Sequence, residues 1–129
     1  MRRIIPLLSA VSIAALAAGC ASRSGYNVDI RNITSETVLV ELKATEKDKE
    51  PQILASKQYV GGSHSTLFSE APARAKVTLE ARLAGQPDRP AAVMPLSLGT
   101  SAVDLIPPLP RHASDPNAPA IRIRERAGY

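Results

Sequence analysis

Residues 37–44 read TVLVELKA, and this stretch gives the clearest indication of the fold. Apolar side chains at its even positions alternate with mostly polar ones at its odd positions, and β-branched residues stand near its start. Because successive side chains of an extended chain point to opposite faces, this period of two predicts a β-strand with one buried face. The rest of the chain repeats the pattern at short intervals.

The same alternation predicts further short strands, separated by turn residues. They cover residues 26–32, 53–60, 66–68, 75–83, 93–98 and 102–106. The polar turn at residues 32–36 is expected to join 26–32 and 37–44 as an antiparallel hairpin. Residues 75–83 also suit a helix capped at Gly85, but a helix would spread their apolar side chains around its circumference, so we prefer a strand. Pro95 has no N–H to donate, which predicts an edge strand or a bulge there.

About seven short strands, spaced about 8–12 residues apart, are typical of an all-β protein. We therefore predict a small antiparallel β-sandwich over residues 26–106, immunoglobulin-like or fibronectin-like in architecture. Three tyrosines, one phenylalanine and no tryptophan leave the core to aliphatic side chains. So few rings also argue against a surface that stacks nucleic-acid bases or sugars.

The charge balance excludes one class of partner. The chain has 16 basic and 12 acidic residues, which gives a formal net charge of +4. Two of the basic residues, Arg2 and Arg3, lie at the start of the chain, and residues 21–106 hold equal numbers of both signs. A body without excess positive charge argues against binding to nucleic acid.

Beyond residue 106 the composition changes. Five of the 11 prolines fall there, so residues 107–119 are not expected to form regular structure. Residues 121–126 alternate again, and two interpretations stay open: an edge strand with its arginines outward, or a disordered end. We treat 107–129 as a Pro-rich basic tail. Its Arg122, Arg124 and Arg126 are candidate contacts for an anionic polymer or lipid.

No catalytic or metal-binding constellation is evident from the sequence. His64 and His112 are the only histidines, and the chain has no G-x-S-x-G motif. The adjacent glycines Gly61 and Gly62 predict a turn rather than a phosphate-binding loop. Four carboxylates are expected on outward strand faces, in water: Asp29, Glu41, Glu80 and Asp104. We therefore expect a protein that is not an enzyme and has no cofactor, metal ion or small-molecule substrate.

The N-terminus carries a different signal. Arg2 and Arg3 precede an apolar run, Ile4–Ala18, which is shorter than the roughly 20 residues that span a bilayer as a helix. The run ends in Leu16-Ala17-Ala18-Gly19-Cys20, with the only cysteine of the chain. This segment resembles the signal peptide and lipobox of bacterial lipoproteins, although Ala17 stands where that class most often has leucine.

The resemblance implies removal of residues 1–19 and attachment of a diacylglycerol to the Cys20 thiol, often followed by acylation of the new amine. Several acyl chains on one residue form a durable anchor, and residues 20–25 would be its tether. Ala21, where an aspartate would favour the inner membrane, implies the periplasmic face of the outer membrane. An uncleaved segment with a free thiol and ordinary secretory cleavage stay open as alternatives.

Together these features predict a lipid-anchored envelope protein that acts as a non-catalytic structural or protein-interaction module. Its expected partner is another envelope protein, bound through exposed strand edges or loops, for example by strand addition. The alternative is that the arginine-rich tail binds an anionic envelope polymer or lipid.

Overall fold

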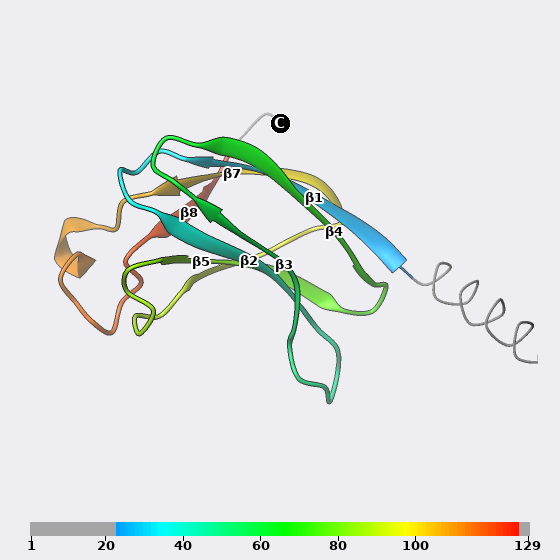
Figure 1. The fold of residues 1–129 in the computed structure, drawn as a ribbon. Helices are drawn as coiled ribbons and strands as arrows, with labels where there is room; N and C mark the ends of the chain where they lie inside the picture. Colours follow the sequence, from blue (N-terminus) through cyan, green and yellow to red (C-terminus); the bar gives the residue numbers. More distant parts are fainter. Residues whose placement is uncertain (1–22, 127–129) are drawn as a thin grey trace, which may run out of the picture.

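The computed structural model describes residues 23–126, and most of this part is β-structure (Figure 1). It contains eight strands, one short 3₁₀ helix and, within the described residues, no α-helix. The strands are β1 (Arg23–Asn32), β2 (Val38–Thr45), β3 (Gln52–Tyr59), β4 (His64–Pro72), β5 (Lys76–Leu83), β6 (Ala92–Pro95), β7 (Gly99–Ile106) and β8 (Arg122–Glu125), and the helix η1 is Pro110–His112. The predicted all-β class is confirmed.

The strands form two four-stranded sheets that pack face to face as a β-sandwich. We call them the β1 sheet, with strand order β4-β1-β7-β8, and the β2 sheet, with strand order β3-β2-β5-β6. Neighbouring strands are antiparallel except β1 and β7, which run parallel with Tyr26 opposite Gly99. The two layers lie one above the other in Figure 1.

An aliphatic core fills the space between the sheets. Burial alternates along β2 as predicted, and Val38, Val40 and Leu42 are fully buried. The side chains packed with them come from both sheets: Val28, Ile30, Tyr59, Leu67, Leu79, Ala81, Val103, Leu105 and Ile121. Burial of this apolar surface is the main term that favours folding.

The predicted hairpin between residues 26–32 and 37–44 is wrong. Strand β1 pairs with β4 and β7, whereas β2 pairs with β3 and β5, so the turn at residues 33–37 carries the chain from one sheet to the other. Alternation predicts which face of a strand is buried, but it does not predict the neighbouring strand. Two strands that each have one apolar face can pack against each other across a core, from different sheets, as well as pair by hydrogen bonds in the same sheet.

Other strand predictions hold in part. Residues 76–83 form a strand and not a helix, and Pro95 lies on the edge strand β6. Strand β6 stops at Pro95, short of the predicted end at residue 98, and Leu98 is 64% exposed. Strand β4 is longer than the predicted 66–68, because the alternation of burial continues through its polar residues on both sides.

The C-terminal segment joins the sandwich. Residues 107–119 contain only η1 as a helix or strand, in line with their prolines, and then Ala120 and Ile121 are buried. Strand β8 follows and pairs with β7, with Arg124 opposite Asp104. Of the two interpretations of residues 121–126, the structure therefore has the edge strand.

Candidate functional site

Asp104 is the centre of an ion cluster on the outer face of the β1 sheet. Arg31 Nε and Nη2 each donate to one carboxylate oxygen of Asp104 at 3.0 Å. Arg124 Nη2 donates to Oδ2 at 3.1 Å, and Arg126 Nε lies 3.1 Å from Oδ1. Alternation correctly places Asp104 on the outward face, but the three guanidinium groups cover it so fully that its side chain is only 2% exposed. The prediction of a solvated carboxylate at this position is therefore wrong.

Arg126 extends the cluster across the sheet. Its Nη2 donates to Asp29 Oδ2 at 3.1 Å, and Asp29 Oδ1 in turn contacts His64 Nε2 at 2.6 Å. The cluster thus joins β4, β1, β7, β8 and the residue after β8 by side-chain contacts across the four-stranded sheet.

The electrostatics of the cluster indicate a structural role. Hydrogen bonds from Arg31 hold the pKa of Asp104 below its ordinary value, against the opposing effect of burial, and the same pairing raises the pKa of Arg31. A carboxylate that stays ionised and is covered by three cations has no open position for a substrate or a proton transfer. We conclude that these groups brace the sheet.

The three arginines predicted as anion contacts lie together at the β8 edge, but they are not equally available. Arg124 and Arg126 are bound to Asp104, and their side chains are 57% and 22% exposed. Arg122 is exposed, and its Nε donates to the carbonyl of Pro107 at 2.9 Å.

Asn32 organises the turns at the end of the sandwich where β1 finishes. It is fully buried, and its Nδ2 donates to the carbonyls of Glu36, Tyr59 and Val60 at 2.8, 2.9 and 3.2 Å. Its Oδ1 accepts from the Thr34 amide and hydroxyl. Every polar group of the side chain is used, so Asn32 stabilises the crossing between the sheets.

Arg89 has the same role for the proline-rich segment. Its guanidinium donates to four main-chain carbonyls at 2.8–3.1 Å, those of His112, Ala113, Asp115 and Ala118. It also donates to Gln86 Oε1 at 3.1 Å. Nothing in the sequence around Arg89 indicated this, because the four carbonyl acceptors lie at least 23 positions further along the chain.

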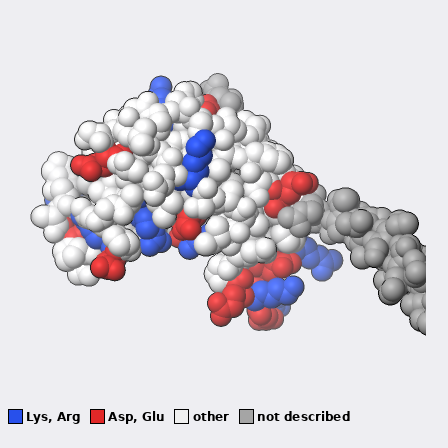
Figure 2. All heavy atoms as spheres, viewed as in Figure 1, with Lys and Arg blue, Asp and Glu red and all other residues white. Residues whose placement is uncertain are grey.

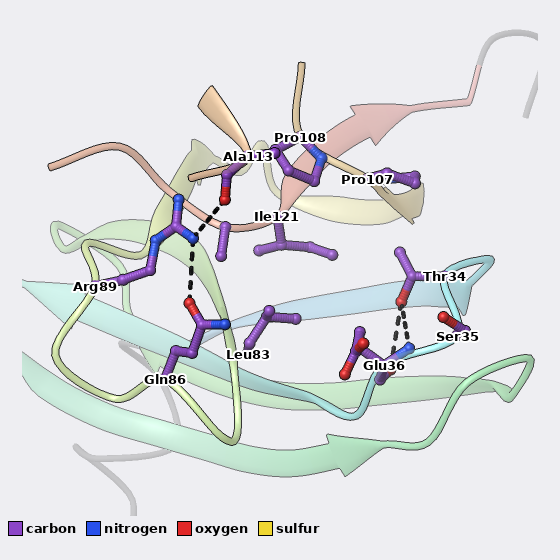
Figure 3. Close-up of a pocket in the computed structure, with 11 residues that line it drawn as sticks. Thr34, Ser35, Glu36, Leu83, Gln86, Arg89, Pro107, Pro108, Ala113 and Ile121 are labelled. Carbon is purple, nitrogen blue, oxygen red and sulfur yellow. Dashed lines mark hydrogen bonds between the residues drawn. The ribbon is translucent and has the colours of Figure 1, made fainter. Parts of the chain in front are cut away.

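The segment held by Arg89 closes one side of a pocket of about 210 Å³. Figure 3 shows Leu83 and Ile121 in its middle, with Arg89 to one side and Thr34 to the other. The walls are mostly apolar and include Pro107, and the volume is below the 300–1,000 Å³ usual for ligand sites. The polar residues of its lining include Gln86 and Arg89, which are hydrogen-bonded to each other, and Arg89 also donates to the carbonyls of the proline-rich segment.

Strand β4 is an open edge of the β1 sheet, with nine residues in unbroken register with β1. The Asn32 amide donates to the Ser63 carbonyl, and the Ile33 amide donates to Leu105 of β7. The even-numbered residues of β1 therefore point their backbone groups toward β4, and the odd-numbered residues point theirs toward β7. Since backbone groups alternate in direction along a strand, and Asn32 bonds to Ser63, the odd-numbered residues of β4 are the ones that bond to β1. The main-chain groups of His64, Thr66 and Phe68 therefore point away from the sheet.

The structure places both histidines. His64 pairs with Asp29 on the sheet surface, and His112 ends η1 in the proline-rich segment. Among residues 23–126, no group of three or more histidine, cysteine or carboxylate side chains could hold a metal ion. Cys20 lies outside the described residues.

Charged side chains of both signs gather on the loop between β2 and β3, which projects from the sandwich in Figure 2. Lys49 Nζ lies 3.4 Å from Glu46 Oε2 within this loop.

In the part of the chain that the structure describes, no helix is long and apolar enough to cross a membrane. The chain matches no protein-family model and no curated protein.

Proposed function

We propose that the protein is a lipid-anchored, non-catalytic interaction module of the bacterial cell envelope, and that β4 is the edge through which it binds a protein partner. The observation that carries this proposal is the open side of β4. Donors and acceptors of His64, Thr66 and Phe68 point outward there in a row. An added strand would satisfy them, as in other cases of β-strand addition.

The anchor is the second part of the proposal. The lipobox-like residues 17–20 support lipidation of Cys20, with the mature protein on the periplasmic face of the outer membrane. Strand β1 begins at Arg23, and three residues reach at most about 11 Å. The sandwich would then lie directly against the membrane surface, where a partner in the same membrane is within reach.

The experiment is photo-crosslinking of the full-length protein in native membranes. A benzophenone amino acid replaces Thr66 on β4 or, as the matched control, Thr100, an exposed threonine on the inner strand β7 of the same sheet. We expect a protein adduct from position 66 and not from position 100. Equal adducts from both positions, or none from position 66, would refute binding at the edge.

Mass spectrometry of the same preparation tests the anchor. We expect a mature chain that begins at Cys20 and carries the mass of a diacylglycerol, and a Cys20→Ala variant that lacks this mass. An unmodified thiol, or a mature chain with another first residue, would refute the anchor without touching the edge of β4.

The alternative, binding of an anionic polymer or lipid by Arg122, Arg124 and Arg126, has less support. Two of these side chains are already bound to Asp104, which leaves fewer of their donors for a further anion. Such binding would weaken steeply with salt and would be lost in an Arg122→Gln variant. If salt has no effect on membrane or polymer binding, this alternative is refuted.

A further inference from the structure

Each of the four sheet edges in the described part of the chain can be compared for its ability to accept another strand. Strand β3 contains a register shift against β2 and an exposed Lys57. Strand β6 has four residues and ends in Pro95, and β8 has four residues with exposed Arg122 and Arg124. These are the devices that proteins use to prevent edge-to-edge pairing.

Strand β4 has such devices only near its C-terminal end, where Glu70 is charged and exposed and Pro72 has no N–H. It has nine residues in continuous register with β1, it contains no lysine or arginine, and its one proline is the last residue, Pro72. A long edge with so little protection is unusual in a native protein and indicates that the edge is occupied.

The direction of the backbone groups restricts how a strand can pair there. The outward groups belong to even-numbered residues, so an antiparallel partner must place its own outward residues opposite them. When the partner is a second β4, the alignment centred on Phe68 would place Pro72, which has no N–H, opposite His64. The longest alignment that leaves Pro72 unpaired is centred on Leu67 and covers residues 64–70. It places Thr66 opposite Phe68 of the second copy, and His64 opposite Glu70 of the second copy.

This alignment is complementary in its side chains as well. His64 Nε2 contacts Asp29 Oδ1, so the second ring nitrogen of His64 is the one that can bond to a carboxylate of the partner, and Glu70 is exposed on the same face of β4. The Phe68 side chain is 61% exposed, although its ring lies close to Gly25, where a Cβ would be 3.6 Å from Phe68 Cε1. In the alignment the two Phe68 rings become diagonal neighbours, which lie within reach of each other.

We propose that β4 pairs with β4 of a second copy of this chain, antiparallel and centred on Leu67, so that the two β1 sheets join into one continuous sheet. This inference rests on the proposed function, since it names the partner of the same edge. The interface is isologous, and each contact on one side of the two-fold axis recurs on the other.

The test uses two full-length copies with different C-terminal epitope tags, produced together in one cell. The benzophenone amino acid at position 66 should give an adduct that contains both tags, and the same amino acid at position 100 should not. A single-tag adduct with another protein would overturn the dimer and leave the proposed function standing. If position 66 gives no adduct at all, both fail.

A backbone variant makes the test quantitative. Thr66→Pro removes a donor that points away from β1, so the sandwich itself keeps its hydrogen bonds. The two-fold axis doubles the number of hydrogen bonds lost, and at about fivefold for each bond we expect a dimer about 25-fold weaker in a dilution series in detergent. Thr66→Val, which keeps the donor, is the matched control. The inference is overturned if both variants dimerise as the wild type does.

Discussion

Replacement of Asp104 by asparagine keeps the volume of the side chain and removes one buried negative charge. Three guanidinium groups would then face each other across a neutral amide on the outer face of the β1 sheet. In the wild type two of them bind the carboxylate from neighbouring strands, Arg31 at 3.0 Å and Arg124 at 3.1 Å. The substitution therefore tests whether the cluster holds β1, β7 and β8 together.

The size of the effect follows from the exposure of the partners. Removal of one member of a buried ion pair typically costs about 3–5 kcal/mol, because the remaining charge is left without compensation. Here Arg31 and Arg124 are 45% and 57% exposed, so water can compensate them in part. We expect a loss near the lower limit, about 3 kcal/mol. For a domain of this size that corresponds to a fall in Tm of about 12–24 °C.

The assay is urea and thermal unfolding of the full-length protein, followed by far-ultraviolet circular dichroism. Glu80→Gln is the matched control, since Glu80 accepts from Lys43 at 3.0 Å on the outer face of the β2 sheet, and its side chain is 18% exposed against 2% for Asp104. It should cost less than about 1 kcal/mol. Our interpretation of the cluster is refuted if Asp104→Asn costs no more than this control.

Three further outcomes are expected. The pKa of Asp104 is lower in the folded protein than in the unfolded chain, so its ionised form stabilises the fold. This contribution is complete above the ordinary aspartate pKa of about 3.9 and is lost as the pH falls through the lower folded value. In urea titrations at graded pH, acid should therefore destabilise the wild type more steeply than Asp104→Asn. Arg89→Ala leaves four carbonyls without their donor, so limited proteolysis should cut within residues 107–119 in the variant and not in the wild type. Gly61→Ala would bring a Cβ within 2.9 Å of the backbone of the turn between β1 and β2. It should lower the free energy of unfolding by about 1–3 kcal/mol in urea titrations. Gly85 has open space around it, so Gly85→Ala should leave this free energy unchanged.

The sequence was sufficient to predict the two layers of the fold but not to predict which strands pair within each layer. Alternation in residues 37–44 and 75–83 predicted the buried faces of β2 and β5, because the period of two is a local property of an extended chain. The partners of β1 depend on which strands reach the same sheet, and that is decided by packing between distant segments. A turn such as residues 32–36 fits a hairpin and a crossing equally well.

The same limit explains the side chains that the sequence left unassigned. Asp104 alternates with buried neighbours as an outward residue should, but its burial depends on Arg31, which lies 73 positions earlier. Asn32 lies in the predicted polar turn at residues 32–36, and an asparagine two residues before a threonine suits the local bonding that its Oδ1 makes to Thr34. That signal was present and had a structural meaning.

The anchor and the proposed pairing together constrain how the protein would sit on a membrane. Strand β1 is antiparallel to β4, so antiparallel pairing of two β4 strands directs the two β1 starts toward opposite ends of the dimer. Both anchors then reach one bilayer only if the two-fold axis, which is perpendicular to the joined sheet, is also perpendicular to the membrane.

The short tether selects one of the two faces. With the β2 sheet toward the membrane, the sheet separation of about 10 Å and a layer of side chains would raise β1 beyond the roughly 11 Å that three residues can span. With the β1 sheet toward the membrane, Arg23 lies near the surface, and the outer face with Phe68, Arg31 and Arg124 meets the headgroups. A dimer found with its β2 sheet against the bilayer would therefore contradict either the pairing at β4 or the attachment at Cys20.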